Sequence, residues 1–321
     1  MMYYLGIDGG GTKTKFSICD EKGIIKASVE ETTCHYLQVG FDGVTKIINK
    51  GLDDICSSIN IKRDNITYAF AGIPGYGDVR KDMKFIEEAV KDAMKQIPFS
   101  IGNDGENALA GSLCCKDGIN IVAGTGSIGF GYNSQTNTTL KCGGWHHGIG
   151  SDEGSAYWIA YNLLHEYTRQ IDGRDEKTEL YHKVKDFLKL EDDGDVIKVV
   201  ISEWKLDRTK VASLSVLADE LYSNNDKYAI EIVNEAAKQL AELVISLHNN
   251  LKFNKKITVS YSGGVFKMGD KIIEPLKKQL SSIDCSLEKP VLSPDKGSLL
   301  LALKNNNIKI TDEIIHNMKN N

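Results

Sequence analysis

A glycine-cornered hairpin occurs twice in this sequence, in distant parts of the chain, and the fold has to accommodate both copies. Each copy has a short apolar run, a tight turn of Gly with Thr or Ser, and an alternating run that predicts a second strand. The copies are YLGIDGGGTKTKFSICDEKG at residues 4–23 and NIVAGTGSIGFGYN at residues 120–133.

A turn of this kind points several consecutive backbone N–H groups into one small volume, which forms a binding site for an anion. Glycine suits the turn because a Cβ would obstruct an approaching phosphate and because glycine tolerates positive φ. Thr12 and Thr125 add a hydroxyl donor to each copy. Either hairpin alone is also compatible with an ordinary strand turn. The two together predict duplicated domains that hold a phosphate between them.

The other predicted elements follow the hairpins in two similar cycles. In the first cycle we predict strands at residues 3–8, 14–19, 24–30, 66–73 and 99–104, and helices at residues 44–59, 82–97 and 107–115. In the second cycle we predict strands at residues 119–126, 127–133, 140–144, 257–267 and 285–291, and helices at residues 152–167, over most of 177–250 and from 296 onward. A Rossmann fold is disfavoured, since neither glycine turn is followed directly by a helix.

Composition narrows the function classes. A chain of 321 residues with 41% hydrophobic and 26% charged residues is long enough for two domains. Its net charge of -5 and scattered Lys and Arg argue against a nucleic-acid partner and against binding to an anionic membrane. The chain lacks a secretory signal and an apolar run of roughly 18 residues, so we expect a cytosolic protein. The seven cysteines show no C-x-x-C pair, and we expect reduced, mostly buried thiols.

Four motifs in order carry a resemblance to a known family. DGGGTKT (8–14) resembles the first phosphate motif of the sugar kinase, Hsp70 and actin superfamily, VAGTGS (122–127) the second, and SYSGGVFK (260–267) the adenosine motif. GGWHHGIGSDEGSAYWIA (143–160) resembles a segment of the N-acetylglucosamine kinases and their relatives in the BadF/BadG/BcrA/BcrD ATPase family. Each motif alone is weak, but their order along nearly the whole chain is specific.

The resemblance implies an α/β fold of two duplicated ribonuclease-H-like (actin-like ATPase) domains with a nucleotide cleft between them. The first domain would span residues 1–115, with the helices of 296–321 packing back on it, and the second would span 116–295 with a helical insertion. It also implies an ATP-dependent and Mg²⁺-dependent amino-sugar kinase that phosphorylates the 6-hydroxyl of a small sugar while the domains close to exclude water. A homodimer is compatible with the family.

The motif positions assign roles to individual residues by resemblance. Asp104 would be the catalytic base, and Asp8 would hold Mg²⁺ through water. The nucleotide would contact Gly9, Gly10, Gly11, Thr12, Lys13, Gly124, Thr125, Gly126, Ser213, Ser262, Gly263 and Gly264. The sugar would contact Cys34, His35, Asn103, Asp104, Ser127, Ile128, Gly144, Trp145, His146, Asp152 and Glu153.

Several of these positions also have a structural interpretation. Asp104 could serve as a helix N-cap, and Asp8 could simply begin a turn. Asp152 and Glu153 could be acids that complement the start of a helix. The turn at 262–264 could serve packing alone. A zinc site at Cys142, His146 and His147 is disfavoured, because no second ligand pair has suitable spacing.

Two departures from the family pattern bear on the sugar. Cys34 and Ile128 stand where N-acetylglucosamine kinases carry sugar-facing Asn residues, and Ser151 is an apparent insertion. An unpaired buried hydroxyl costs roughly 1 to 3 kcal/mol, so two missing amides suit plain N-acetylglucosamine poorly. We therefore expect that the enzyme accepts N-acetylmuramic acid, whose lactyl ether replaces the 3-hydroxyl, with or without N-acetylglucosamine. Glucosamine is an alternative substrate.

Two other functions are compatible with parts of the sequence. The first is the related ATPase that activates acyl-CoA dehydratases or reductases and bridges its dimer with an iron–sulfur cluster; its candidate ligands here would be the adjacent Cys114 and Cys115 in a helical run. An anaerobic UV-visible spectrum distinguishes that protein from a kinase. The second is a sugar sensor on a kinase fold, which usually adds a DNA-binding domain, and no basic segment precedes Tyr3.

Overall fold

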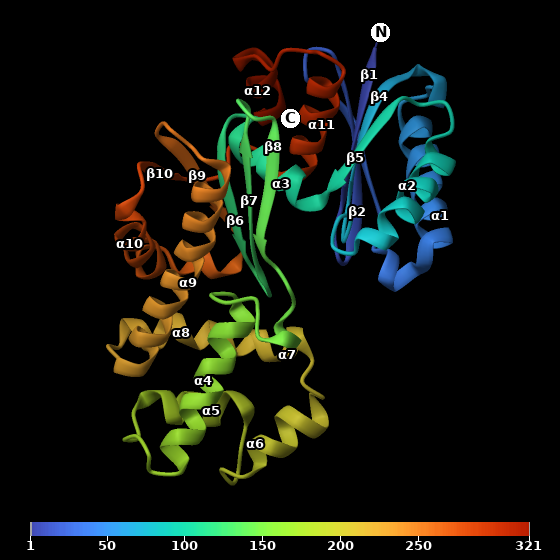
Figure 1. Cartoon of the computed structure of the whole chain (residues 1–321). Coiled ribbons are helices and arrows are strands. Elements are labelled where there is room, and N and C mark those ends of the chain that lie inside the picture. Colours follow the sequence, from blue (N-terminus) through green and yellow to red (C-terminus); the bar gives the residue numbers. More distant parts are fainter. Residues whose placement is uncertain (1, 321) are drawn as a thin grey trace. The chain divides into compact units, whose positions relative to one another are not determined.

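The computed structural model describes residues 2–320, and these divide into two compact units (Figure 1). The first unit combines residues 2–118 with residues 289–320, and the second spans residues 119–288. The chain therefore passes between units at 118/119 and 288/289, whereas the sequence placed these boundaries at 115/116 and 295/296.

The first unit is built on a five-stranded sheet with strand order β3-β2-β1-β4-β5. The strands are β1 (Tyr3–Gly9), β2 (Lys13–Asp20), β3 (Ile25–Thr32), β4 (Ile66–Ile73) and β5 (Phe99–Asn103). β1, β2 and β3 form an antiparallel meander, and β4 and β5 run parallel to β1. The helices are α1 (Tyr36–Ser58), α2 (Arg80–Met94), α3 (Asp104–Leu113), α11 (Pro294–Asn305) and α12 (Asp312–Lys319).

Both faces of this sheet are buried, and the alternation along β1 shows how. Leu5 and Ile7 are fully buried in the cluster that includes α1 and α2. Tyr4, which points to the opposite face, is fully buried in the cluster that includes α11 and α12. β1 is consequently a central strand that is apolar on both sides, and the C-terminal helices complete the core of the first unit.

The second unit repeats the design with strand order β10-β9-β6-β7-β8. Its strands are β6 (Gly118–Ala123), β7 (Ser127–Asn133), β8 (Thr138–Gly143), β9 (Ile257–Ser262) and β10 (Cys285–Glu288). Its helices are α4 (Ala156–Ile171), α5 (Glu179–Leu188), α6 (Asp195–Ile197), α7 (Arg208–Ser213), α8 (Leu217–Ser223), α9 (Lys227–Leu251) and α10 (Asp270–Gln279). Helices α5 to α8 form the predicted insertion, and one core cluster joins them to α4, α9 and the sheet. The predicted α/β class with two duplicated domains is confirmed.

Three details differ from the sequence prediction. α1 begins at Tyr36, because His35 caps it, and it kinks at Gly40, whose φ is 70°. α4 begins at Ala156 after the N-cap Ser155, not at residue 152. Cys114 and Cys115 do not lie within a helix: α3 ends at Leu113, and both cysteines have positive φ. All seven cysteines are free thiols, and four of them are buried.

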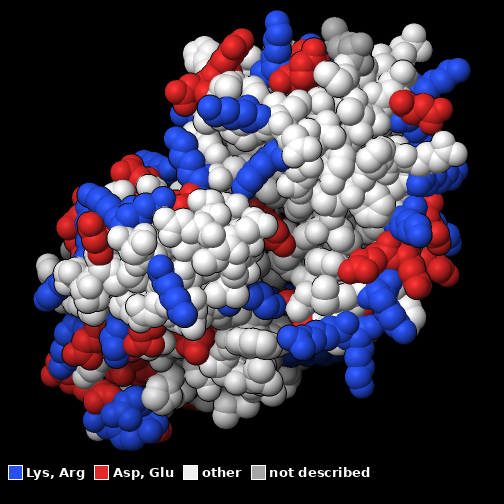
Figure 2. Space-filling view, turned by 45° about the horizontal axis from the view of Figure 1, so that its top comes forward, with Lys and Arg blue, Asp and Glu red and all other residues white. Residues whose placement is uncertain are grey.

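The surface carries charges of both signs. The face shown in Figure 2 has Lys and Arg side chains interspersed with Asp and Glu. Among residues 2–320, none of the helices combines the length and the apolar character needed to cross a bilayer.

Candidate active site

Two side chains outside the turn between β1 and β2 donate hydrogen bonds to its backbone carbonyls. The hydroxyl of Thr33 donates to the carbonyl of Gly10 at 2.7 Å, and the amide of Gln38 donates to the carbonyl of Gly11 at 3.0 Å. The N–H of Gly10 closes the turn on the carbonyl of Lys13 at 2.8 Å. Two consecutive carbonyls are therefore fixed in direction.

The turn between β6 and β7 is held in the same way by a helix. The N–H of Ala156 donates to the carbonyl of Gly124 at 2.8 Å, and the N–H of Tyr157 donates to the carbonyl of Thr125 at 3.3 Å. The N–H of Gly124 closes this turn on the carbonyl of Gly126 at 2.9 Å. The first turn of α4 thus replaces the Thr33 and Gln38 side chains of the first unit.

These restraints determine where the next N–H groups point. In a planar trans peptide a carbonyl and the following N–H point in opposite directions. The N–H groups of Gly11 and Thr12 in one turn, and of Thr125 and Gly126 in the other, therefore point away from the groups that hold the carbonyls. Within residues 2–320 none of the four donates to a protein acceptor. Each turn offers two adjacent donors, which is the geometry of an anion site.

The glycines of these turns are not needed for positive φ, which corrects one part of the expectation. All five have φ outside the left-handed region: Gly9, Gly10, Gly11, Gly124 and Gly126. A Cβ on Gly11 or Gly124 would meet no atom within 4 Å, so these positions are open to a ligand. A Cβ on Gly9 would lie 2.5 Å from Pro74, so that glycine serves packing.

Asp8 and Asp104 lie at one edge of the first sheet. Asp8 of β1 stands opposite Gly72 of β4, which stands opposite Gly102 of β5, and Asp104 follows two residues later. The three strands are parallel, so their carboxyl ends meet at this edge.

Burial and the approach of the two carboxylates change their protonation. Burial raises the pKa of Asp104 to about 7, and the negative charge of Asp8 is the next largest cause. Burial likewise raises the pKa of Asp8 to about 6, although a 2.8 Å hydrogen bond from Asn107 offsets part of the rise. A pair of crowded, weakly neutralised carboxylates is typical of a functional site.

The helix that starts at Asp104 is not capped by Asp104, so that alternative is corrected. The N-cap is Asn103, whose side-chain oxygen accepts the N–H of Gly105 at 2.9 Å. The carboxylate of Glu106 accepts the N–H of Asn103 at 3.0 Å, completing a capping box. The Asn103 amide also donates to the carbonyl of Tyr76 at 2.8 Å. Asn103, predicted to contact the sugar, therefore has both ends of its amide engaged within the protein.

A cavity of about 580 Å³ opens beside the second turn. Its walls come from the turn, the start of α4, α7, the segment that leads into α8, and the turn after β9. The residues that line it are Gly124, Thr125, Ala156, Ile159, Thr209, Ala212, Ser213, Ser215, Val216, Asp219, Gly264, Val265, Lys267 and Met268. The structure thus brings together four residues predicted to bind nucleotide: Gly124, Thr125, Ser213 and Gly264.

The neighbouring residue Gly263 has a structural role. Its φ is 108°, and a Cβ would lie 2.3 Å from the carbonyl oxygen of Ala123. Glycine is required here because the end of β9 approaches the end of β6 at backbone distance. Ser262 and Gly263 do not line the cavity, whereas Gly264 does.

Asp152 is also engaged differently from the helix-capping alternative. Ser155 caps α4 by accepting the N–H of Trp158, and the first turn of α4 has no acidic residue. Asp152 is 2% exposed; its carboxylate accepts a bond from Arg208 at 2.6 Å and lies 3.4 Å from the N–H of Ser127. The capping interpretation of Asp152 and Glu153 is therefore wrong.

The segment before Asp152 is an exposed loop. Trp145 is 62% exposed, and its N–H donates to the hydroxyl of Ser151 at 3.3 Å. His146 has φ 85° and caps a short turn by accepting the N–H of Gly148. The ring of His147 packs on Tyr157 with centroids 4.3 Å apart. No group of three His, Cys, Asp or Glu side chains suited to a metal ion occurs among residues 2–320.

The remaining predicted sugar and nucleotide contacts are distributed as follows. Cys34 is fully buried in the core of the first unit, and the charges of Asp104 and Asp8 act on its thiol. His35 caps α1 through Nδ1, and Lys13 pairs with Glu30 at 2.8 Å. The hydroxyl of Ser127 donates to the carbonyl of Glu153 at 2.6 Å. Ile128 stands opposite Gly143 and packs over Gly144, where a Cβ would lie 2.7 Å from its side chain.

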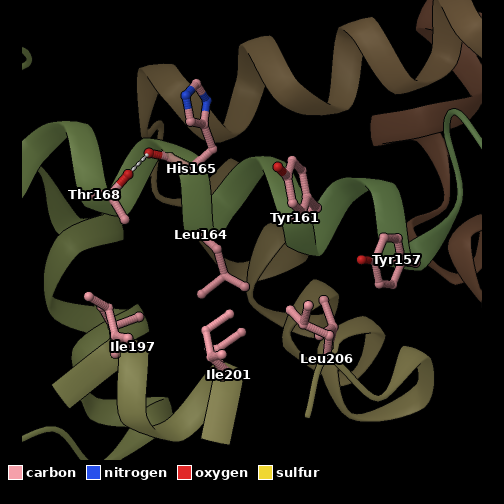
Figure 3. A pocket seen from close by; sticks show the side chains of 11 residues that line it. Tyr157, Tyr161, Leu164, His165, Thr168, Ile197, Ile201 and Leu206 are labelled. Carbon is pink, nitrogen blue, oxygen red and sulfur yellow. Dashed lines mark hydrogen bonds between the residues drawn. The ribbon is translucent and has the colours of Figure 1, made fainter. Parts of the chain in front are cut away.

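The insertion carries a second, apolar hollow of about 260 Å³ (Figure 3). Tyr157, Tyr161 and Leu164 of α4 form one wall, and Ile197, Ile201 and Leu206 lie on the facing segment. At one end, the hydroxyl of Thr168 donates to the carbonyl of His165 at 2.7 Å. No pattern in the sequence predicts this hollow, because its residues come from separate helices.

The sequence did not predict a role in the site for three residues: Thr33, Gln38 and Arg208. The first two act on the first turn from outside the motif, and Arg208 reaches Asp152 across 56 positions. A polar side chain shortly after a meander was the only available signal for Thr33 and Gln38. Arg208 had none, because it lies in a helical region without a motif.

The two five-stranded sheets share one topology, and each has a glycine turn with two exposed N–H donors after its first strand. This arrangement defines a two-domain protein with a sugar-kinase-like fold. The chain belongs to the BadF/BadG/BcrA/BcrD ATPase family, whose profile matches residues 5–286. The family resemblance expected from the motifs is confirmed, and ATP is the nucleotide that an ATPase family implies.

Individual relatives agree with this assignment. The chain is 32% identical over 294 residues to an N-acetylmuramic acid/N-acetylglucosamine kinase of Clostridium acetobutylicum, covering 88% of this chain and 91% of that protein. It is 28% identical over 313 residues to an N-acetyl-D-glucosamine kinase of Dictyostelium discoideum, covering 94% and 97%. Among solved structures, a candidate N-acetylglucosamine kinase of Chromobacterium violaceum superposes with a TM-score of 0.68 at 20% identity, covering 94% of this chain and 99% of that one. At this identity the likeness shows the fold.

Proposed function

We propose that this protein is an ATP-dependent kinase of N-acetylated amino sugars that transfers the terminal phosphoryl group to the 6-hydroxyl of N-acetylmuramic acid, N-acetylglucosamine or both. The observation that carries the proposal is the paired design of the two turns, each with two fixed carbonyls and two free N–H donors. The Clostridium and Dictyostelium relatives, named as kinases of these sugars, support the substrate class.

The second turn and its cavity suit the nucleotide. A volume of about 580 Å³ lies within the range of small-molecule sites, and Gly124 and Thr125 of the second turn line it. Gly264 and Ser213 leave space and a hydroxyl at the opposite walls. We assign the phosphates to the turn and the adenosine to the walls formed by α7 and residues 264–268.

Asp104 suits the role of general base. The O6–H proton passes to its carboxylate as O6 bonds to the terminal phosphorus and the bond from that phosphorus to the leaving oxygen of ADP breaks. A base works best when its pKa lies near the working pH, and burial raises the pKa of Asp104 to about 7. Because Asn103 supplies the helix cap, the Asp104 carboxylate is available for this role.

The residues around Asp8 fit a magnesium ion. Asp8 is crowded by Asp104 and Asp295, and its only hydrogen-bond donor among the described side chains is Asn107. A single carboxylate suffices, because Mg²⁺ keeps several waters and binds few protein groups. Bound there, the ion would neutralise phosphate charge during transfer.

The test is sugar-dependent ADP release by the full-length protein with ATP and Mg²⁺. The panel contains N-acetylmuramic acid, N-acetylglucosamine, glucosamine and glucose, and ³¹P NMR locates the phosphate on the product. We expect turnover of at least one N-acetylated sugar to its 6-phosphate. Turnover of glucosamine alone would move the assignment to a glucosamine kinase. ADP release that no sugar stimulates would overturn the proposal.

A further inference from the structure

The ion pair between Arg208 and Asp152 lies directly against the second turn. Arg208 begins α7, and its Nη2 lies 2.6 Å from a carboxylate oxygen of Asp152. A Cβ on Gly126 would lie 2.0 Å from that same Nη2 and 2.9 Å from the other carboxylate oxygen. Glycine at 126 is therefore what allows the guanidinium to reach this position.

Most of the guanidinium is not used by the protein. It has five N–H donors, and the bond to Asp152 engages only Nη2. The Nε atom is buried and has no partner among residues 2–320. The Arg208 side chain is 36% exposed, whereas that of Asp152 is 3% exposed. Asp152 thus anchors the guanidinium from the buried side and leaves the exposed side able to bind a ligand.

His147, which lies near Arg208, also has a ring nitrogen without a hydrogen-bond partner among the described residues. The Nδ1 atom of His147 is buried and unpartnered among the described residues. Its ring is fixed by packing on Tyr157 and lies 4.1 Å, centroid to centroid, from His146. Burial, the neighbouring His146 and the charge of Arg208 lower the pKa of His147, so its ring is a neutral hydrogen-bonding group near the guanidinium.

The position of Arg208 favours the sugar over the nucleotide. The next residue, Thr209, lines the nucleotide cavity, but Arg208, Asp152 and Gly126 do not. Arg208 instead contacts the segment of 143–160 that resembles the sugar-binding stretch of the family. Nearby, the apolar Ile128 is the second residue of β7, at the position where the family resemblance implies a sugar-facing amide.

We propose that Arg208, assisted by His147, binds the carboxylate of an acidic amino sugar, namely the lactyl carboxylate of N-acetylmuramic acid. The inference rests on the proposed function and selects one substrate within it. A planar guanidinium forms parallel bonds to a carboxylate, which a lysine ammonium cannot reproduce. The lactyl ether also removes the 3-hydroxyl as a donor, so the apolar Ile128 leaves fewer polar groups unpaired.

The test compares two substrates that differ in the carboxylate: N-acetylmuramic acid and 3-O-methyl-N-acetylglucosamine. The quantity is the ratio of their kcat/KM values. We expect Arg208→Gln to lower this ratio about 10- to 100-fold, the effect of losing a charge-assisted hydrogen bond. Arg208→Lys keeps a charge beside Asp152 and should lower the ratio about 10-fold. Lys210→Gln, an exposed charge on the same helix, is the matched control and should leave the ratio unchanged.

Thermal unfolding of each variant shows whether it is folded. Arg208→Gln could fail to fold because it leaves Asp152 buried and unpaired. In that case the ratio of kcat/KM values measured for Arg208→Lys tests the inference. An unchanged ratio in folded variants overturns the inference. If kcat/KM falls equally for both sugars and the KM for ATP rises, Arg208 binds a phosphate of ATP instead, and the inference is again overturned. Wild-type turnover of N-acetylglucosamine without any turnover of N-acetylmuramic acid overturns the inference and leaves the proposed function standing; absence of all sugar turnover overturns both.

Discussion

Asn103 caps the helix on which Asp104 lies. Its side-chain oxygen accepts the N–H of Gly105 at 2.9 Å, and Glu106 completes the box by accepting the N–H of Asn103 at 3.0 Å. The residue before the candidate base therefore performs the structural task that the base itself could have performed. Burial and the charge of Asp8 raise the pKa of Asp104, and backbone hydrogen bonds from Gly105 and Asp104 offset part of the rise.

The titration of Asp104 should respond to Asp8. In the nucleotide-free protein we expect the Asp104 carboxyl to titrate with a pKa of about 7, well above the ordinary value of 3.8. Asp8→Asn removes the second largest cause of this rise and should move the titration to lower pH. Carboxyl ¹³C NMR, with the Asp104 resonance identified by Asp104→Asn, measures it. Asp92→Asn, an exposed change on α2, is the control, and a wild-type titration near 4 would contradict the electrostatic account.

The same pKa fixes the direction of the pH dependence of catalysis. The base acts in its deprotonated form, so kcat/KM should fall as pH decreases through the pKa and rise to a plateau above it. If Mg²⁺ binds at Asp8 as proposed, its charge would offset that of Asp8 and this limb should shift to lower pH. Rates measured from pH 5 to 9 at several Mg²⁺ concentrations test both statements. A rate that rises on acidification would assign the proton transfer to another group.

The first turn should depend on the side chain that holds it. Thr33→Val removes the donor to the Gly10 carbonyl and frees the peptide that orients the N–H of Gly11. We expect the KM for ATP to rise about tenfold, the usual effect of one lost hydrogen bond. Thr32→Val, at the neighbouring exposed position on β3, should change the KM less than about threefold. Similar values for both variants would mean that the turn does not need this restraint.

Alanine substitutions at the adjacent Gly263 and Gly264 should have different effects, one on the stability of the fold and the other on ATP binding. Gly263→Ala places a Cβ 2.3 Å from the carbonyl of Ala123 at a φ of 108°, so we expect the free energy of unfolding to fall by about 2–5 kcal/mol. Gly264→Ala meets no atom within 4 Å and should fold normally, but it narrows the cavity and should weaken ATP binding. Urea unfolding and calorimetric titration with ATP measure the two effects. A stable Gly263→Ala protein would contradict the assigned backbone contact.

The sequence allowed the main elements and the two turns to be predicted because their evidence is local. Gly and Thr stand next to one another in each motif, and the strands beside them alternate or are apolar throughout. The capping box was also readable in principle, since Asn103 and Glu106 have the N-x-x-E spacing. The choice between Asn103 and Asp104 as the cap was not, because both residues cap helices about equally well.

Long-range contacts explain what could not be predicted. The burial of Cys34 depends on packing against Gly9, and the engagement of Asp152 depends on an arginine in the helical insertion. Neither contact leaves a pattern in a single sequence. The start of α4 was misplaced for the same reason, because Asp152 is drawn into the ion pair and Ser155 caps the helix instead.

The assignment of Asp104 as the base of a sugar kinase is tested most directly by the steady-state kinetics of Asp104→Asn, compared with the wild type. The assay measures ADP release with N-acetylmuramic acid and N-acetylglucosamine at saturating Mg²⁺ and ATP. We predict that kcat falls by about 10² to 10⁴, the usual contribution of a general base, while the KM for ATP changes less than about threefold. A variant that retains its sugar-dependent rate within about tenfold of the wild type would contradict the account.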